Sequence, residues 1–471
     1  MSGPEIITLG CRLNIAESET MRTLAGGQDD LVIVNSCAVT NEAVRQTRQA
    51  IRRARRARPD ARILVTGCAA QTDPAMFAAM PEVDSVVGNR EKFDPLSFRH
   101  SREGGDPSPA LSPSDAAGEW IPAFAGMTNH KIRISDIMAV RDTAPHLVSG
   151  FADHARAFVE VQNGCDHRCT FCIIPYGRGN SRSVPAGAVI DKIKALVDAG
   201  YREVVLTGVD VTSYGPDLPG KPTLGLLIER ILDKVPELPR LRLSSLDSVE
   251  IDERMFDFIT RNERIMPHLH LSLQAGDDMI LKRMKRRHSR EQAIALVERI
   301  KAARPEIAIG ADIIAGFPTE TEEMFDNSVR LVADCDIVYG HVFPFSPRTG
   351  TPAARMPQLA PAVIKERAAR LRAACDARKG QWLASLKGTR QKVLVERDGL
   401  SGHAENFAPV TLSPSPQRRL GSPMAGSYHA DTDPNLRWGD ARIEPMAHPG
   451  TILPVTIIGL EKGRLIAQEA L

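Results

Sequence analysis

The chain has 471 residues, a formal net charge of +2 and 25% charged residues. Its length allows two to four domains, and its composition is that of an ordinary soluble protein, so charge alone does not mark it as a nucleic-acid binder. We find no signal-peptide pattern and no apolar run of the roughly 18 residues that a membrane span needs. The cysteine usage favours a reducing compartment, and we expect a cytoplasmic protein without membrane contact.

The first 98 residues form the first predicted domain. Three apolar runs in it each end in a small residue and a cysteine: 6–11, 31–37 and 63–68, ending at Cys11, Cys37 and Cys68. Helical stretches at 16–25 and 41–57 separate the runs, which predicts an N-terminal βαβ open parallel sheet. Parallel strands end at one edge, where such sheets bind ligands. One such cysteine is usually a core residue, but three equivalent positions predict a shared [4Fe–4S] cluster.

The predicted helix 41–57 carries arginine around much of its circumference. Such a run is usually a solvated face, but guanidinium groups also suit phosphate recognition, and both interpretations stay open. The RNA-binding candidates on this helix are Arg48, Arg52 and Arg55.

Two stretches, 99–130 and 413–440, are rich in proline, glycine and serine and lack sustained periodicity. Both resemble translated repetitive elements, so we expect mobile surface loops without a catalytic role. Residues 131–154 then form a linker.

Three cysteines lie within eight residues at Cys165, Cys169 and Cys172. They cannot pair evenly as disulfides, and a structural zinc ion usually takes four protein ligands. A [4Fe–4S] cluster on three thiolates leaves one iron open to a small molecule. The spacing resembles the signature of the radical S-adenosylmethionine (SAM) enzymes, where SAM occupies that iron; zinc, with His167 or a distant cysteine, is the alternative.

Residues 155–384 predict a central partial (β/α)6 barrel. The expected strands are 157–162, 203–207, 241–245, 268–273, 307–313 and 337–343, with helical patterns such as 186–199 between them. Such barrels place their chemistry at the C-terminal strand ends, where the Cys165 loop begins. The SAM-binding candidates are Phe171, Gly208, Ser245, Gln274 and Asp312. A second basic cluster adds the RNA-binding candidates Lys282, Lys285 and Arg286.

Residues 385–471 predict a small C-terminal β-barrel, with strands at 391–396, 408–412, 451–459 and 464–468. Such a module after an enzyme barrel is often one that binds RNA backbone. Cys335 and Cys375 lie in helical contexts without partners, and we interpret both as structural.

Together these features resemble the methylthiotransferases of the radical SAM superfamily. The order of a three-cysteine domain, a radical SAM domain and a TRAM domain fits that family. The motifs that fit the branch acting on threonylcarbamoyladenosine in tRNA are 8–14, 163–165, 173–179 and 341–346. The insertion in the TRAM strands is a departure, which puts full tRNA affinity in doubt.

The resemblance implies two [4Fe–4S] clusters. Cys165, Cys169 and Cys172 would hold the cluster that cleaves SAM, and Cys11, Cys37 and Cys68 an auxiliary cluster that carries the sulfur. A methylthio group would replace the hydrogen on carbon 2 of the modified adenine, chemistry that acid–base side chains cannot perform. The implied partners are the tRNA anticodon stem-loop and an electron donor such as flavodoxin or ferredoxin, with no DNA.

Two alternatives to this interpretation remain. The first keeps the enzyme class but changes the substrate from threonylcarbamoyladenosine to isopentenyladenosine in tRNA or to a ribosomal protein, as in related branches of the family. A zinc-stabilised RNA-binding protein without catalysis is the non-enzymatic alternative.

Overall fold

The structure, a computed structural model, describes residues 3–98, 131–141, 143, 150–151, 154–413 and 447–470. It divides into two compact units. The first comprises residues 1–148, 163–182 and 346–351, and the second residues 149–162, 183–345 and 352–471. Segment 163–182, which we predicted within the barrel domain, thus clusters with the N-terminal residues. The two predicted loops lie outside the described residues, apart from Ser413.

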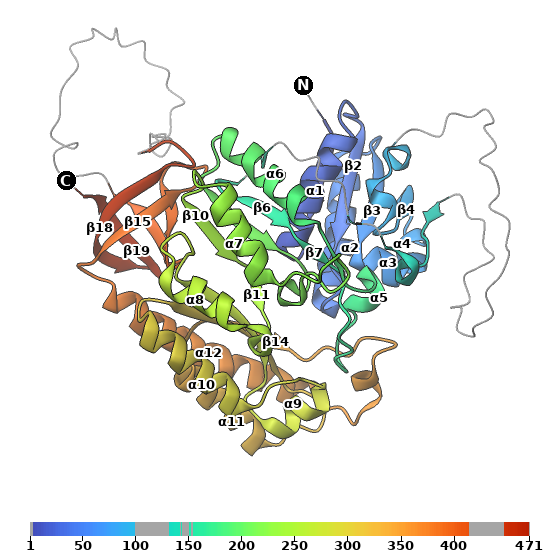
Figure 1. Cartoon of the computed structure of the whole chain (residues 1–471). Helices are drawn as coiled ribbons and strands as arrows, with labels where there is room; N and C mark the ends of the chain where they lie inside the picture. The colour runs from blue at the N-terminus through green and yellow to red at the C-terminus, as the bar shows by residue number, and fades with distance from the viewer. Residues whose placement is uncertain are drawn as a thin grey trace, which may run out of the picture. The chain divides into compact units, whose positions relative to one another are not determined.

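The first unit contains a five-stranded parallel sheet in the order β1-β2-β3-β4-β5 (Figure 1). Its strands are β1 Glu5–Thr8, β2 Leu31–Ser36, β3 Arg62–Gly67, β4 Ser85–Val87 and β5 Ile132–Arg133. Its helices are α1 Arg12–Leu24, α2 Asn41–Ala57, α3 Cys68–Thr72, α4 Pro74–Ala78 and α5 Ile174–Arg178. The predicted open parallel sheet is therefore confirmed.

Helix α1 begins at Arg12, four residues before the predicted start. Cys11 is still extended, with φ −87° and ψ 171°, and the helix begins directly after it. The prediction was wrong because the polar residues of the first turn hide the apolar periodicity. Helix α2 has the predicted bounds, and the Thr40 side chain caps it by accepting the Ala43 N–H at 3.1 Å.

Val86 of β4 pairs with Ile132 of β5, so these two strands are neighbours in one sheet. Residues 99–130 stand between these two strands in the sequence and lie outside the described residues, so the predicted insertion stays a prediction.

The second unit contains six parallel strand segments in barrel order. They are β6 Ala157–Glu160, β9 Glu203–Thr207, β10 Arg240–Leu243 continued by β11 Ser245–Leu246, β12 His268–Gln274, β13 Ala308–Ala315 and β14 Ile337–Pro344. The sheets are β10-β9-β6 and β11-β12-β13-β14. The helices are α6 Ala186–Asp198, α7 Leu224–Lys234, α8 Glu253–Arg261, α9 Asp278–Met284, α10 Arg290–Ala303, α11 Glu322–Asp334 and α12 Pro361–Ser385. The predicted strand 241–245 is divided at Ser244, where the chain passes from one sheet to the other.

The C-terminal module is a closed barrel in the order β15-β16-β17-β19-β18 (Figure 1). Its strands are β15 Arg390–Val395, β16 Ser401–Ala404, β17 Pro409–Leu412, β18 Ile452–Glu461 and β19 Arg464–Glu469. The sequence analysis missed β16, whose Ser-Gly-His-Ala run lacks β-branched and aromatic residues. No helix within the described residues is both long and apolar enough to cross a lipid bilayer.

Buried charges connect the C-terminal module to the barrel within the second unit. Glu203 at the start of β9 is 1% exposed and lies 3.1 Å from Arg156, 3.1 Å from Arg242 and 3.6 Å from Arg240. Arg240 also donates to Lys392 O at 2.9 Å and Arg242 to Glu405 O at 3.1 Å. One carboxylate thus orients arginines that hold the backbone of the module.

Glu396 extends this contact, and its loss is the first variant we predict. Its carboxylate pairs with Arg156 and lies 3.0 Å from His403 Nδ1. Burial tends to raise the pKa of Glu396, but the His403 bond and Arg156 lower it. The stability that the ionised carboxylate contributes is therefore lost as pH falls below about 4. We expect Glu396→Gln to cost about 1–2 kcal/mol of stability at neutral pH. Chemical denaturation of the full chain measures it, with the exposed Glu461→Gln as control; equal stability of both variants would contradict the role of Glu396.

Candidate active site

Cys11, Cys37 and Cys68 follow the C-terminal ends of β1, β2 and β3, which are adjacent in the sheet. A Cβ on Gly10 would lie only 2.8 Å from Cys37 Cβ, so Cys11 and Cys37 approach closely. Gly10 has φ +98° and Gly67, before Cys68, has φ +94°, a region that glycine adopts without strain. Burial, and then the neighbouring Cys68, raise the pKa of Cys37 to about 12. The three thiols therefore gather at one sheet edge.

Cys165, Cys169 and Cys172 lie in a loop of the same unit, and all three are half-buried. The loop is held by its own backbone: Cys165 N donates to Gly179 O at 3.1 Å and Cys172 N to Cys169 O at 3.1 Å. The Arg168 guanidinium adds bonds of 2.8 Å to Cys165 O and to Asn180 Oδ1. The turn thus gathers three thiols in eight residues.

The number of thiols bears on the zinc alternative. A structural zinc ion usually takes four protein ligands, and each set supplies three thiols. A [4Fe–4S] cluster on three thiolates instead leaves one iron open to a small molecule. Three thiols in a set therefore suit a cluster better than a structural zinc ion.

A buried ionic network lies beside the first cysteine set. Arg178 donates to the two Glu17 carboxylate oxygens at 2.8 and 2.9 Å, and Lys92 Nζ lies 2.7 Å from the same carboxylate. These side chains are 2%, 1% and 0% exposed. Burial alone would raise the pKa of Glu17, but Arg178 and Lys92 hold it at about 2. Two buried cations therefore share one ionised carboxylate.

Two asparagines connect this network to the thiols. Asn14 accepts from Arg178 at 2.6 Å, and its Oδ1 lies 3.8 Å from Cys11 Sγ. Asn89 accepts from Lys92 at 2.8 Å and donates to Cys68 Sγ at 3.9 Å. Arg178 belongs to α5, which begins two residues after Cys172. The segment with the second cysteine set therefore also completes the surroundings of the first.

The sequence analysis did not single out these five network residues. Asn14 and Arg178 do lie inside the motifs 8–14 and 173–179 that carried the family resemblance, which is the signal that could have found them. Glu17 and Lys92 gave none, because a charged residue on a helix is normally solvated.

The SAM-binding candidates fall in both units. Phe171 is half-buried in the cysteine loop of the first unit. Gly208, Ser245, Gln274 and Asp312 lie on strands of the second unit or directly after them. Gln274 has φ +69°, a strained conformation for a residue other than glycine, and such strain often marks functional positions. Their contacts with SAM stay predictions.

Comparison with known proteins identifies the family. The radical SAM superfamily model matches residues 159–332, and the model of the uncharacterized protein family UPF0004 matches residues 4–88. The threonylcarbamoyladenosine tRNA methylthiotransferase MtaB of Rickettsia prowazekii is 50% identical over 87% of this chain and 91% of its own length. The chain belongs to the tRNA methylthiotransferase family. The MtaB protein of Bacillus subtilis is 36% identical over 85% of this chain and 86% of its own. The tRNA-2-methylthio-N(6)-dimethylallyladenosine synthase of Erythrobacter litoralis is 34% identical over 83% and 86%.

In this methylthiotransferase, the RNA-binding candidates on α2 differ in exposure. Arg48 and Arg52 are exposed, and Arg52 lies 3.7 Å from Glu82. Arg55 donates to three backbone carbonyls, those of Pro59, Ala61 and Glu82, and pairs with Asp84. These bonds hold α2 against the adjoining loops. We therefore assign Arg55 a structural role instead of the predicted RNA contact.

The candidates near α9 separate in the same way. Lys282 and Lys285 are exposed and remain available for a phosphate. The Arg286 side chain is 8% exposed, pairs with Asp247 at 3.0 Å and donates to Ser272 O at 2.8 Å. Because these bonds hold the guanidinium inside the fold, we assign Arg286 a structural role as well.

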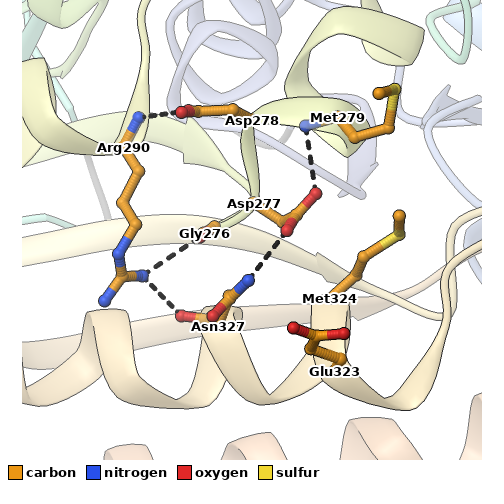
Figure 2. A pocket seen from close by; sticks show the side chains of 8 residues that line it. All are labelled: Gly276, Asp277, Asp278, Met279, Arg290, Glu323, Met324 and Asn327. Carbon is orange, nitrogen blue, oxygen red and sulfur yellow. Dashed lines mark hydrogen bonds between the residues drawn. The ribbon is translucent and has the colours of Figure 1, made fainter.

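A pocket of about 290 Å³ lies among α9, α10 and α11 (Figure 2). Figure 2 shows that its polar groups bond to one another: Asn327 donates to Asp277 at 2.8 Å, and Arg290 donates to Asn327 O at 2.6 Å and Gly276 O at 3.0 Å. These bonds join three helices, so we interpret the pocket as a structural junction and not as a ligand site.

Proposed function

We infer that this chain transfers a methylthio group to threonylcarbamoyladenosine in tRNA, replacing the hydrogen on carbon 2 of the adenine. The observation that carries this is the 50% identity, over 87% of this chain, with a methylthiotransferase named for that nucleoside. Two three-cysteine sites in one folded unit support it, because the reaction needs both a radical source and a sulfur carrier.

We propose two [4Fe–4S] clusters, one on Cys165, Cys169 and Cys172 and one on Cys11, Cys37 and Cys68. When bound, the first supplies the electron that cleaves SAM to a carbon radical, chemistry beyond any acid–base side chain. The Arg178 network keeps positive charge and hydrogen-bond donors beside Cys11 and Cys68. Groups that contact the ligands of a metal orient those ligands and tune the bound metal.

The proposed RNA partner is the anticodon stem-loop, with Arg48, Arg52, Lys282 and Lys285 as candidate phosphate contacts. The cleavage consumes an electron, for which a low-potential donor such as flavodoxin or ferredoxin is suited. A tRNA substrate and two iron–sulfur clusters together favour a reducing compartment such as the cytoplasm.

The nucleoside profile of tRNA from a deletion strain tests the substrate. We expect the 2-methylthio derivative of threonylcarbamoyladenosine to disappear and its unthiolated parent to accumulate. An unchanged profile would remove this function, and a loss of methylthio-isopentenyladenosine instead would move the chain to the related branch.

Anaerobic reconstitution tests the cofactors. We expect about eight iron atoms per chain and a brown protein, as two [4Fe–4S] clusters require. A colourless protein with bound zinc would favour the non-catalytic RNA-binding alternative, and about four iron atoms would leave one cluster only.

A further inference from the structure

Three titratable side chains meet on neighbouring strands of the second unit. His270 lies on β12, Asp312 on β13 and His341 on β14, and Asp312 pairs directly with His341 in the parallel register. His270 Nε2 lies 2.9 Å and His341 Nδ1 3.3 Å from the same oxygen, Asp312 Oδ1. Of the three, the sequence analysis made only Asp312 a site candidate, and His341 lies in the motif 341–346 that carried the family resemblance.

The contacts of Asp312 determine which ring atom of His341 faces away from it. Burial opposes ionisation of Asp312, but His270 and His341 hold its pKa well below the usual range. An ionised carboxylate only accepts hydrogen bonds. His270 Nε2 lies within hydrogen-bond distance of this carboxylate and His341 Nδ1 faces the same oxygen, so Nε2 of His341 is the ring atom that faces away from it.

Exposure differs sharply within the triad. The side chains of His270 and Asp312 are 7% and 19% exposed, whereas that of His341 is 61% exposed. The buried His270 ring is closely enclosed: a Cβ on Gly310 would lie 2.5 Å from His270 Nδ1, and the His270 ring lies 4.5 Å from the His341 ring. The arrangement is an imidazole fixed at one nitrogen and open at the other.

We propose that His341 binds the threonylcarbamoyl substituent of the substrate through Nε2, with Asp312 and His270 as positioning residues. This rests on the function proposed above, and it reassigns Asp312 from SAM binding. The relatives act on nucleosides whose substituents differ in polarity: threonylcarbamoyl offers carbonyl, hydroxyl and carboxylate groups, and dimethylallyl is apolar. A site built to hydrogen-bond a polar group rejects an analogue that lacks it, because its own polar atom is left unpaired.

Affinity for two stem-loop RNAs tests the proposal on the reconstituted full chain. One RNA carries threonylcarbamoyladenosine and the other dimethylallyladenosine. We expect His341→Phe to weaken binding of the first about 10- to 100-fold and the second much less, as for one lost hydrogen bond. His341→Gln places an amide near the Nε2 position and should restore part of the preference. The exposed Asp233→Asn on α7 is the control, and it should leave both affinities unchanged.

Three outcomes would overturn the proposal. An equal loss for both RNAs would make His341 a general contact, and a wild-type preference retained by His341→Phe would make it a bystander. Two imidazoles and a carboxylate are also a metal-ligand set, so one metal ion per chain beyond the cluster iron, lost in His341→Phe, would replace the proposal with a metal site. If the wild-type chain modifies neither RNA, the proposed function is wrong. That result differs from the three outcomes above, which concern the role of His341 alone.

Discussion

Replacing Cys165, Cys169 and Cys172 together by alanine is expected to abolish SAM cleavage and to leave about four of the eight iron atoms. The three thiols are the only protein ligands that we assign to the SAM-cleaving cluster, so no partial site remains. The other cysteine set keeps its own ligands on β1, β2 and β3, and its cluster should persist. Iron analysis, the visible spectrum and 5′-deoxyadenosine production measure the result.

Two matched variants complete this experiment. Replacing Cys11, Cys37 and Cys68 should give the converse result: SAM cleavage persists while methylthio transfer is lost. Cys335 and Cys375 are buried, and burial raises their pKa to about 12 and about 11, so replacing this pair should change neither iron content nor chemistry. Continued SAM cleavage in the Cys165 triple variant would refute the assignment.

Glu17→Gln is expected to be the most destabilising single change of charge in the first unit. It leaves Arg178 and Lys92 buried without their shared anion, and breaking a buried ion pair in this way costs about 3–5 kcal/mol. Thermal unfolding, followed in the transition of the first unit, measures it. Glu42→Gln removes an exposed carboxylate that pairs with Arg45, and it should leave the transition unchanged.

The pH dependence of stability should agree with this. The pKa of Glu17 is held at about 2 in the fold, below the value of about 4.3 for an unfolded chain. The stability that ionised Glu17 contributes is therefore fully present above the pKa of the unfolded chain, and it is lost as pH falls toward 2. The double variant Glu17→Gln/Arg178→Met removes one stranded cation and should recover part of the loss. A Glu17→Gln protein as stable as the parent would contradict the network.

The buried network also explains why a folding defect and a cofactor defect should appear together. Asn14 and Asn89 each contact both an ionic partner and a cysteine sulfur. We therefore expect Glu17→Gln to lower iron retention at the first cysteine set as well as stability.

The sequence by itself determined the positions of both cysteine sets, the N-terminal parallel sheet, the small C-terminal β-barrel and the bounds of α2. These depend on spacing and hydrophobic periodicity within short stretches of the chain. The sequence analysis named Arg55 and Arg286 as candidate RNA contacts. Only the structure shows that they pair with Asp84 and Asp247, which lie at other places in the chain. Only the tertiary structure decided the partners of Glu17 and Glu203 and the triad of His270, Asp312 and His341. Glu17, Glu203 and Asp312 stay ionised because residues distant in the sequence supply opposite charge and hydrogen bonds that offset the cost of desolvation. No local pattern encodes such a partner.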